Sequence, residues 1–431
     1  MKSNKVDKVC VVGVGFVGLT FALALCREGV EVLGWEKSPE LTLSLSSGLT
    51  EISEPGIEEL LANFVRSGDF TMITEPHEAV GANTFIITVG TPLKNGIINL
   101  EFITEATQQI LPCIKDDDLV IIRSTTAVGV CRSVILPILE QSGKRFRLAM
   151  CPERTIEGKA LEEMSSLPQI IGALDEESLI AAKMFFSHIG PEIMEVDSLE
   201  AAELTKLINN TFRDLMFAYG NEVAEIAGAY GVNATQIIKA ANHNYPRSKI
   251  ALPGLSGGPC LEKDPWILVE SGKIKDLSME ISKAARVVNE KTLVSFLNRH
   301  LDLEIPRKKI AILGLAFKGI PETKDLRGSF IFPLAKLLGE RFPEIELHGF
   351  DPANIKLIPR TSILISQSLE DCLREADLVV ILTNSSAFSQ VPKLISKHAD
   401  ERCLILDYWS RDFTSKFLPT QKYISWASGS E

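Results

Sequence analysis

Val9-Cys10-Val11-Val12-Gly13-Val14-Gly15-Phe16-Val17-Gly18 is an apolar run that continues into glycines with G-x-G-x-x-G spacing. The run predicts a buried strand, and the glycines predict a tight turn into a helix whose N-terminus receives a pyrophosphate. Gly13 permits the turn, Gly15 lets the backbone approach the phosphates, and Gly18 lets the helix pack on the sheet. We therefore expect a dinucleotide to contact Gly13, Gly15, Phe16, Val17 and Gly18.

Glu36 ends the second apolar run, residues 31–35. A carboxylate at this position accepts hydrogen bonds from the adenosine ribose and repels a 2′-phosphate, which predicts NAD rather than NADP. A glycine-rich turn without a cofactor is the alternative, and the strand, helix and Glu36 in register disfavour it. Thr91 follows a third apolar run, 84–89, and we expect it at the same edge of the sheet. The alternative is that residues 88–92 form only a turn that ends the strand, without a ligand.

The first part of the chain alternates apolar runs with helical patterns. Strands are expected at 8–14, 31–35, 84–89 and 119–123, helices at 16–28, 56–66, 100–112 and 130–141, and further strands at 146–151, 169–173 and 192–196. Alternation of this kind predicts the α/β class, with a doubly wound parallel sheet covered by helices on both faces.

A long proline-free segment, 199–230, follows and has apolar residues at helical spacing. A helix of this length would span about 45 Å, more than one domain needs. Its apolar positions also outnumber what one stripe needs, so we expect a homodimer interface there. Further helices are expected at 233–242, 264–272 and 276–300. After a linker at 301–307, a second alternating block has strands at 310–314, 346–350, 378–382 and 403–407 and a helix at 328–341.

We therefore expect three domains, which suits a chain of 431 residues. They are a Rossmann-like NAD-binding domain at 1–196, a central helical dimerisation and catalytic domain at 197–300, and a second, smaller Rossmann-like domain at 301–431.

Composition argues against several classes of function. Acidic residues outnumber basic ones by 56 to 45 and no long basic run is present, which argues against a nucleic-acid partner. No apolar run approaches the roughly 18 residues of a membrane span, and no signal peptide is recognisable. The eight cysteines show no CxxC spacing, which argues against a metal site or a disulfide framework. We expect a cytoplasmic protein without a metal.

Cys260 lies in Gly257-Gly258-Pro259-Cys260-Leu261-Glu262-Lys263-Asp264, a segment poorly suited to an apolar core. An alcohol oxidised at a nicotinamide site becomes a carbonyl, and a nearby thiol can capture this carbonyl as a thiohemiacetal that then loses a second hydride. Lys263 would favour the thiolate through its positive charge. A buried structural cysteine is the alternative for Cys260, and it is the expectation for the other seven cysteines.

Several different short motifs are spread along the whole chain. They are Val12–Leu19, Glu54-Pro55-Gly56, Thr91-Pro92, Arg123-Ser124-Thr125, Cys151-Pro152-Glu153-Arg154, Gly257-Gly258-Pro259-Cys260, Lys263-Asp264 and Leu315-Ala316-Phe317-Lys318. In content and order they resemble the UDP-glucose/GDP-mannose dehydrogenase family of nucleotide-sugar 6-dehydrogenases.

The resemblance implies an NAD-dependent, four-electron oxidation of the C6 hydroxymethyl group of a nucleotide sugar to a uronic acid, for polysaccharide biosynthesis. It implies that Cys260 is the catalytic thiol and that Lys206 and Asn210 polarise the developing oxyanions. Asp264 and Thr125 would act on a water near C6.

The resemblance also implies binding roles and a UDP-sugar-binding function for residues 301–431. Glu153 would assist thioester hydrolysis. Implied cofactor contacts, besides the glycine turn and Glu36, are Thr91, Thr125, Lys263 and Arg327; implied substrate contacts are Glu153, Arg154, Lys206, Asn210, Arg247, Gly257 and Lys318.

The sugar is suggested by two motif spellings. Cys151-Pro152-Glu153-Arg154 and the segment 260–266 resemble family members that act on N-acetylated hexosamines. UDP-N-acetyl-mannosamine or UDP-N-acetyl-glucosamine is therefore the first expectation, UDP-glucose the second and GDP-mannose the third. A two-electron dehydrogenase of the 3-hydroxyacid type and a non-catalytic nucleotide-sugar-binding protein stay as alternatives, but neither needs Cys260.

Overall fold

The computed structural model describes residues 8–94, 96–190, 192–301, 308–409, 413 and 417–427. The chain forms two compact units, one made of 1–209 with 266–278 and the other of 210–265 with 279–431. Helix α8 (Leu199–Ala229) begins in the first unit and ends in the second. The division into three domains stays a prediction, and residues 302–307 of the predicted linker lie outside the described residues.

The first unit is built on an eight-stranded sheet in the order β10-β9-β8-β7-β4-β1-β2-β3. The strands are β1 (Val9–Val12), β2 (Val32–Trp35), β3 (Phe70–Ile73), β4 (Thr84–Ile87), β7 (Asp118–Ile122), β8 (Phe146–Met150), β9 (Gln169–Ala173) and β10 (Ile193–Val196), with a small hairpin β5 (Leu93–Lys94) and β6 (Ile97–Ile98) beside them. The six strands from β3 to β8 are parallel, which confirms the predicted class. β9 runs antiparallel to β8, and β10 is parallel to β9.

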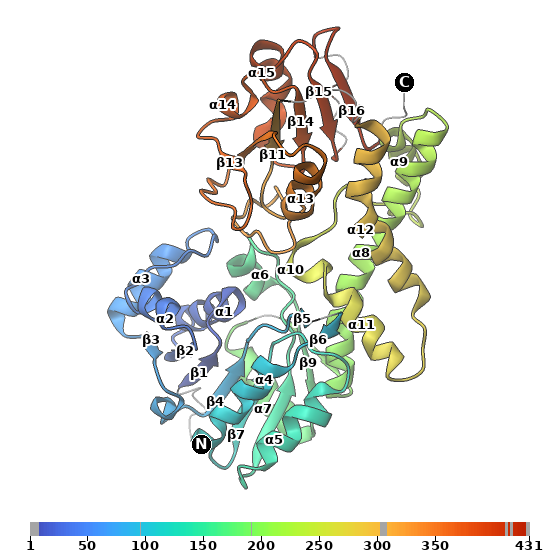
Figure 1. Cartoon of the computed structure of the whole chain (residues 1–431). Helices are drawn as coiled ribbons and strands as arrows, with labels where there is room; N and C mark the ends of the chain where they lie inside the picture. Colours follow the sequence, from blue (N-terminus) through green and yellow to red (C-terminus); the bar gives the residue numbers. More distant parts are fainter. Residues whose placement is uncertain are drawn as a thin grey trace. The chain divides into compact units, whose positions relative to one another are not determined.

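Helices cover this sheet (Figure 1). They are α1 (Phe16–Arg27), α2 (Pro39–Ser46), α3 (Ile57–Ser67), α4 (Glu101–Ile110), α5 (Leu136–Glu140), α6 (Ala160–Ser166) and α7 (Glu176–Ser187). α1, α3, α6 and α7 share one apolar core with the sheet, and α4 packs against α5. Phe21 of α1 contacts Phe185 and Phe186 of α7, with ring centroids 6.5 and 6.1 Å apart. This packing fixes the helix that follows the glycine turn.

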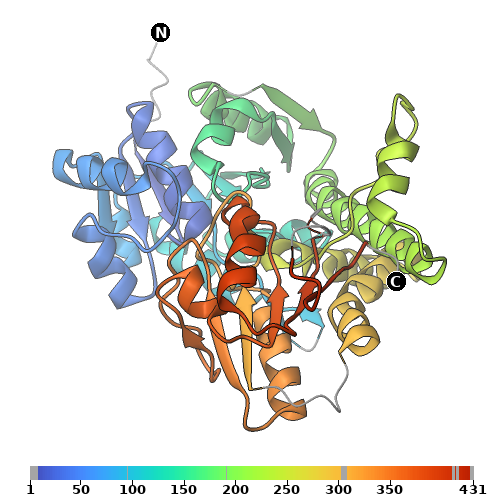
Figure 2. The same ribbon diagram turned by 90° about the horizontal axis from the view of Figure 1, so that it is seen from above.

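The second unit contains a six-stranded parallel sheet in the order β13-β12-β11-β14-β15-β16 (Figure 2, orange to red). Its strands are β11 (Lys309–Leu313), β12 (Glu346–Phe350), β13 (Leu364–Ile365), β14 (Leu378–Ile381), β15 (Leu404–Asp407) and β16 (Lys422–Ser425). Its helices are α9 (Ala234–Asn242), α10 (Gly258–Leu261), α12 (Glu280–His300), α13 (Ile331–Arg341), α14 (Leu369–Leu373) and α15 (Val391–His398). Helix α11 (Asp264–Lys273) crosses the division between the units. The predicted second α/β block is confirmed.

Aromatic side chains attach α12 to this second sheet. The Phe296 ring contacts the rings of Tyr408 and Trp426 edge-on, at centroid distances of 4.7 and 5.4 Å. The Tyr408 hydroxyl donates to the Leu293 carbonyl oxygen at 2.7 Å. Edge-on aromatic pairs of this kind add to the area that they bury, so α12 is held firmly against the sheet.

Within the described ranges, no helix has both the length and the apolar character that a bilayer crossing requires. The cytoplasmic location stays a prediction.

Gly18→Ala is expected to lower the free energy of unfolding by about 1–3 kcal/mol. A Cβ at residue 18 would collide with the Gly13 carbonyl oxygen and lie 2.7 Å from Thr88 Oγ1. Gly15→Ala is the matched control, because no atom lies within 4 Å of the place its Cβ would take; its cost should not exceed about 1 kcal/mol. Urea unfolding of both variants makes the comparison, and equal losses would contradict the packing role given to Gly18.

Candidate active site

A hollow of about 430 Å³ lies at the carboxyl ends of β1, β2 and β4. Its lining includes Gly13, Gly15, Glu36, Gly90, Phe102 and Gln109. The carboxyl edge of a parallel sheet, where strand order reverses, is the place where such folds bind ligands. The glycine turn and Glu36 are therefore brought together as the sequence predicts.

This hollow fits a dinucleotide. Gly13 has a φ of +87°, which only glycine adopts readily. Gly15 is exposed and has open space where a side chain would stand. Oε1 of Gln109 is buried and has no hydrogen-bond partner in the part of the chain that the structure describes. An open glycine turn and a free acceptor in one hollow suit a ligand that carries phosphates and amino donors.

Glu36 supports the turn as well as lining the hollow. Its Oε2 accepts from the Val14 amide at 2.9 Å, and its Oε1 accepts from the Ser38 amide at 3.2 Å. The bond to Val14 joins the glycine turn to the end of β2, and the bond to Ser38 orients the Glu36 carboxylate. A contact between Glu36 and a ribose stays a prediction.

The loop after β7 carries Thr125, which is half-buried. The Thr91 hydroxyl donates to the Thr125 carbonyl oxygen, so the two predicted residues lie together. Farther along this loop, the amides of Gly129 and Cys131 donate to the Glu203 carboxylate at 2.6 and 2.8 Å. Burial raises the pKa of Glu203, and the amide donors oppose that rise. Glu203, on α8, thus holds the Thr125 loop in place.

Glu153, after β8, is almost fully buried and makes bonds with both carboxylate oxygens. Arg123 donates to Oε2, and the amides of Arg154 and Thr155 donate to Oε1 at 2.6 Å. Burial alone would raise the pKa of Glu153, but Arg123 and the amide donors lower it to about 2. The Lys206 ammonium donates to the Glu153 carbonyl oxygen. Glu153 is therefore a fixed carboxylate, and its backbone orients Lys206.

Cys260 differs from the other cysteines in exposure. It lies on the short helix α10 and is exposed, whereas six of the eight are buried and Cys113 is half-buried. Burial raises the pKa of Cys10 to about 12 and that of Cys372 to about 11. A thiol must be reachable and able to ionise to act as a nucleophile, so Cys260 is the cysteine that meets the first of these requirements.

Asp264 lies four residues after Cys260 and is fully buried. Its Oδ1 accepts from the Lys263 ammonium and its Oδ2 from the Asn210 amide, both at 2.6 Å. Lys263 is thus paired with Asp264. The structure brings Asn210, Lys263 and Asp264 together in one chain of hydrogen bonds.

A buried arginine holds the Cys260 loop at two points. Arg286 of α12 donates to the Leu261 carbonyl oxygen at 2.7 Å and to the Ser256 carbonyl oxygen at 3.0 Å. Its charge is paired with Asp214 of α8 at 2.7 Å. Burial raises the pKa of Asp214, and Arg286 opposes that rise. Neither Asp214 nor Arg286 is predicted from the sequence, because the two residues are far apart in the chain and belong to no motif.

Gly257 and Gly258 allow other loops of the same unit to approach Cys260. A Cβ on Gly257 would lie 2.5 Å from the Gly328 carbonyl oxygen, and one on Gly258 would overlap the Phe317 ring. The Lys318 ammonium lies 5.3 Å from the centre of that ring. Gly257, Lys318 and the 327–328 turn therefore gather at the Cys260 loop.

The remaining two predicted residues are less informative. Arg327 is largely exposed and forms an ion pair with Asp325, with Nη2 2.6 Å from Oδ2. Arg247 is exposed and stacks on Tyr245, with Cζ 4.7 Å from the ring centre. No described contact joins Arg247 to the other predicted site residues.

The predicted residues form one set in each unit. The first unit holds the glycine turn, Glu36, Thr91, Thr125, Glu153, Arg154 and Lys206; the second holds Asn210, Arg247, Gly257, Cys260, Lys263, Asp264, Lys318 and Arg327. Lys206 and Asn210 are one helical turn apart on α8 and share a face.

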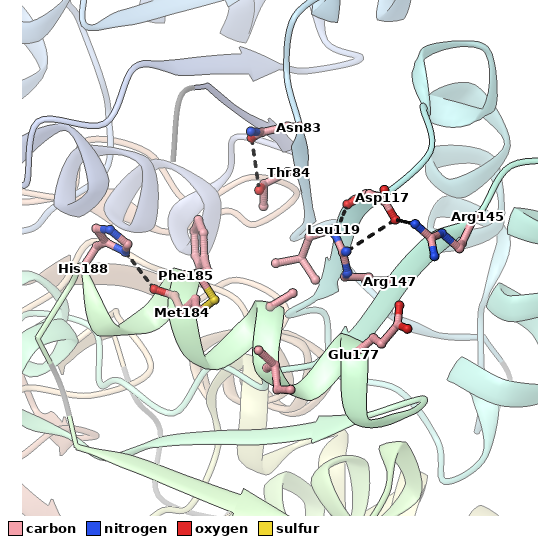
Figure 3. A pocket seen from close by; sticks show the side chains of 12 residues that line it. Asn83, Thr84, Asp117, Leu119, Arg145, Arg147, Glu177, Met184, Phe185 and His188 are labelled. Carbon is pink, nitrogen blue, oxygen red and sulfur yellow. Dashed lines mark hydrogen bonds and ion pairs between the residues drawn. The ribbon is translucent and has the colours of Figure 1, made fainter. Parts of the chain in front are cut away.

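A second hollow, of about 560 Å³, lies at the amino ends of β4, β7 and β8 (Figure 3). Arg145 and Arg147 share the Asp117 carboxylate, at 2.6 and 3.4 Å, and Glu177 also lines the hollow. None of the predicted site residues lines it. The glycine turn and Glu36 lie instead at the carboxyl edge of the sheet.

Glu153→Gln is expected to lower the free energy of unfolding by roughly 3 kcal/mol at pH 7, since a pKa lowered from 4.5 to about 2 corresponds to that energy. A lowered pKa stabilises the fold above the ordinary pKa, and this contribution is lost as pH falls toward 2. The gap between wild type and variant should therefore be constant from pH 5 to 8 and narrow between pH 4.5 and 2. Urea unfolding across this range measures it.

The exposed Glu162 serves as the control, because Glu162→Gln should change stability little at any of these pH values. A Glu153→Gln gap that does not change with pH would show that the Arg123 pair does not control this carboxylate.

Comparison with known proteins identifies the family. Models of the NAD-binding, central and UDP-binding domains of the UDP-glucose/GDP-mannose dehydrogenase family match residues 7–190, 200–291 and 311–411. A UDP-N-acetyl-D-mannosamine dehydrogenase from Methanococcus maripaludis is 33% identical over 403 residues, which cover 90% of this chain and 88% of that protein.

Two solved structures share the fold over almost their whole length. A UDP-D-ManNAc dehydrogenase from Pyrococcus horikoshii has a TM-score of 0.85 at 29% identity and covers 97% of this chain and 99% of its own. A UDP-glucose dehydrogenase from Pyrobaculum islandicum has a TM-score of 0.87 at 25% identity and covers 100% and 99%. With the cofactor hollow and the motif residues in place, these matches show that the chain belongs to the UDP-glucose/GDP-mannose dehydrogenase family and is an NAD-dependent nucleotide-sugar dehydrogenase.

Proposed function

We propose that the protein oxidises the C6 hydroxymethyl group of a UDP-N-acetylhexosamine, UDP-N-acetyl-D-mannosamine first, to the uronic acid. The observation that carries the thiol chemistry is the exposure of Cys260 on α10, with Asp264 four residues away. The choice of sugar is supported by the Methanococcus relative and by the Cys151–Arg154 motif. UDP-glucose is the second candidate, because the Pyrobaculum enzyme of that name has an equally similar fold.

The glycine turn, Glu36 and Thr91 are proposed to hold the cofactor. NAD bound there would supply the hydride acceptor for each of two oxidations, so two NADH would form for each uronic acid. Lys206 and Asn210 are proposed to stabilise negative charge on the C6 oxygen, the first through its ammonium group and the second through its amide donor. The two residues lie one helical turn apart on α8.

Cys260 is proposed to act between the two oxidations. Its sulfur attacks the C6 aldehyde carbon, a C–S bond forms, and the aldehyde oxygen takes up a proton to give a thiohemiacetal. Transfer of a hydride from C6 to a second NAD, with loss of the hydroxyl proton to water, would convert the thiohemiacetal to a thioester. Water then adds to the thioester carbonyl, the C–S bond breaks, and the uronic acid and the thiolate separate.

Asp264, Thr125 and Glu153 are proposed to serve the water steps. Asp264 accepts from Lys263 and Asn210, so two donors hold its carboxylate in a fixed orientation. Thr125 supplies a hydroxyl on a loop that Glu203 fixes. Glu153, whose pKa is lowered to about 2, suits a role as a permanent hydrogen-bond acceptor better than that of a proton carrier.

Wild type is expected to form two NADH for each uronic acid made from UDP-N-acetyl-D-mannosamine. Its turnover of other UDP- and GDP-sugars should be slower. Cys260→Ser should lose turnover by at least about 10³-fold, because a hydroxyl is a poor nucleophile here and an ester hydrolyses more slowly. Cys260→Ala should bind NAD and the nucleotide sugar normally but fail to convert the 6-aldehyde to acid. NADH absorbance and product analysis measure these outcomes.

Cys113→Ala is the matched control, since Cys113 is half-buried and lies outside the predicted site. Near-normal acid production by Cys260→Ala would show that the thiol is structural, and turnover of UDP-glucose faster than any N-acetylated sugar would reverse the order of substrates.

We also propose a homodimer through α8. The helix exposes a stripe of large apolar side chains at spacings of four and seven, namely Leu204, Ile208, Phe212, Tyr219 and Ile226. The last three are more than half exposed, at 59%, 53% and 59%. A contiguous exposed apolar stripe of this length is typical of a protein interface, and a second copy of the same helix would cover it.

Phe212→Asp is expected to produce a monomer, because it places a charge in the middle of the stripe. Arg213→Asp introduces the same side chain at the neighbouring exposed position outside the stripe, and should remain a dimer. Analytical ultracentrifugation compares the two with wild type. A Phe212→Asp protein that sediments as an unchanged dimer would remove α8 from the interface.

A further inference from the structure

The cofactor hollow contains a cation that bears on the choice between NAD and NADP. Lys37 directly follows Glu36 after β2, and both residues line the hollow. An ammonium group is suited to bind a 2′-phosphate, the group that distinguishes NADP from NAD. Lys37 on its own would therefore oppose the preference for NAD.

Glu105 of α4 forms an ion pair with Lys37. The Lys37 ammonium lies 2.7 Å from Oε1 and 2.8 Å from Oε2 of Glu105, so both carboxylate oxygens engage it. Glu105 also lines the hollow. The pair thus places a carboxylate and a neutralised ammonium in the lining, instead of a free positive charge.

Glu36 has other partners. Its two oxygens accept from the Val14 and Ser38 amides, so its charge supports the glycine turn. Neutralisation of Lys37 comes from α4, a separate element that the sequence motif for NAD does not include.

The Lys37–Glu105 pair is expected to contribute little to the stability of the fold. The Lys37 side chain is 66% exposed and the Glu105 side chain 34% exposed, and exposed ion pairs typically contribute at most about 1 kcal/mol. The larger effect of the pair is expected on a charged ligand in the same hollow.

We propose that Glu105 is a specificity-determining residue, which excludes NADP by holding Lys37 in an ion pair and by adding its own negative charge to the hollow. The proposal rests on the NAD site and not on the chemistry of Cys260. Its test is accordingly a binding measurement, independent of turnover.

Dissociation constants for NAD and NADP should be measured by calorimetry at low salt for wild type, Glu105→Gln, Lys37→Ala and the double variant. Glu105→Gln should tighten NADP binding by about fivefold to tenfold, the effect of one ordinary hydrogen bond at a partly exposed site, and change NAD binding less than about threefold. The double variant should lose most of that gain, because the freed ammonium is its cause. Adenosine 2′,5′-bisphosphate and ADP, used as probes, should repeat the contrast.

Glu101→Gln is the matched control, because Glu101 lies one turn earlier on α4 and does not line the hollow; it should leave both affinities unchanged. Unchanged NADP affinity in Glu105→Gln would overturn the proposal, as would a gain that persists in the double variant. A wild type that binds neither dinucleotide would overturn the NAD site itself, and the proposal with it.

Discussion

The buried side of helix α8 carries a row of polar side chains among its apolar ones, and much of the structure depends on this row. Glu203, Lys206, Asn210, Asp214 and Asn221 recur at helical spacing and are all buried. A buried polar group is costly unless it is hydrogen-bonded, so each of these side chains fixes the group that it contacts. Those groups are the loop after β7, the Glu153 carbonyl, the Asp264 carboxylate, the Arg286 guanidinium and the Trp426 indole. The exposed side of the helix carries large apolar residues, such as Phe212 and Ile226, among its polar ones.

Two buried arginines position the proposed site within their own units. Arg123 pairs with Glu153, bonds Gln169 and stacks on Phe21, with Cζ 4.1 Å from the ring centre. Arg286 pairs with Asp214 and holds the Cys260 loop. Buried ion pairs add little net stability because desolvation offsets their attraction. Their contribution here is geometric: each arginine brings together segments that hydrophobic packing alone would leave free to shift.

The sequence predicts the parts of this structure that depend on local pattern. Short apolar runs identified β1, β2, β4 and β7, and a long proline-free stretch identified α8, because period and length are local properties. The reversed direction of β9 and β10 was not predicted, since strand pairing is decided by tertiary contacts. The motif residues Glu36, Cys260 and Asp264 could be named in advance. The ion pairs Asp214–Arg286 and Lys37–Glu105 could not be predicted, because the two residues of each pair lie about 70 positions apart and meet only in the fold.

The central claim is that one exposed thiol links two oxidations through a covalent bond to C6. Acid-quenched turnover mixtures, digested and analysed by mass spectrometry, test it most directly. The account predicts a nucleotide-sugar acyl adduct on the peptide that contains Cys260, released by hydroxylamine as a thioester is, and no adduct on the other cysteine-containing peptides. An unmodified Cys260 peptide throughout steady accumulation of acid, or an adduct on a different cysteine, would contradict it.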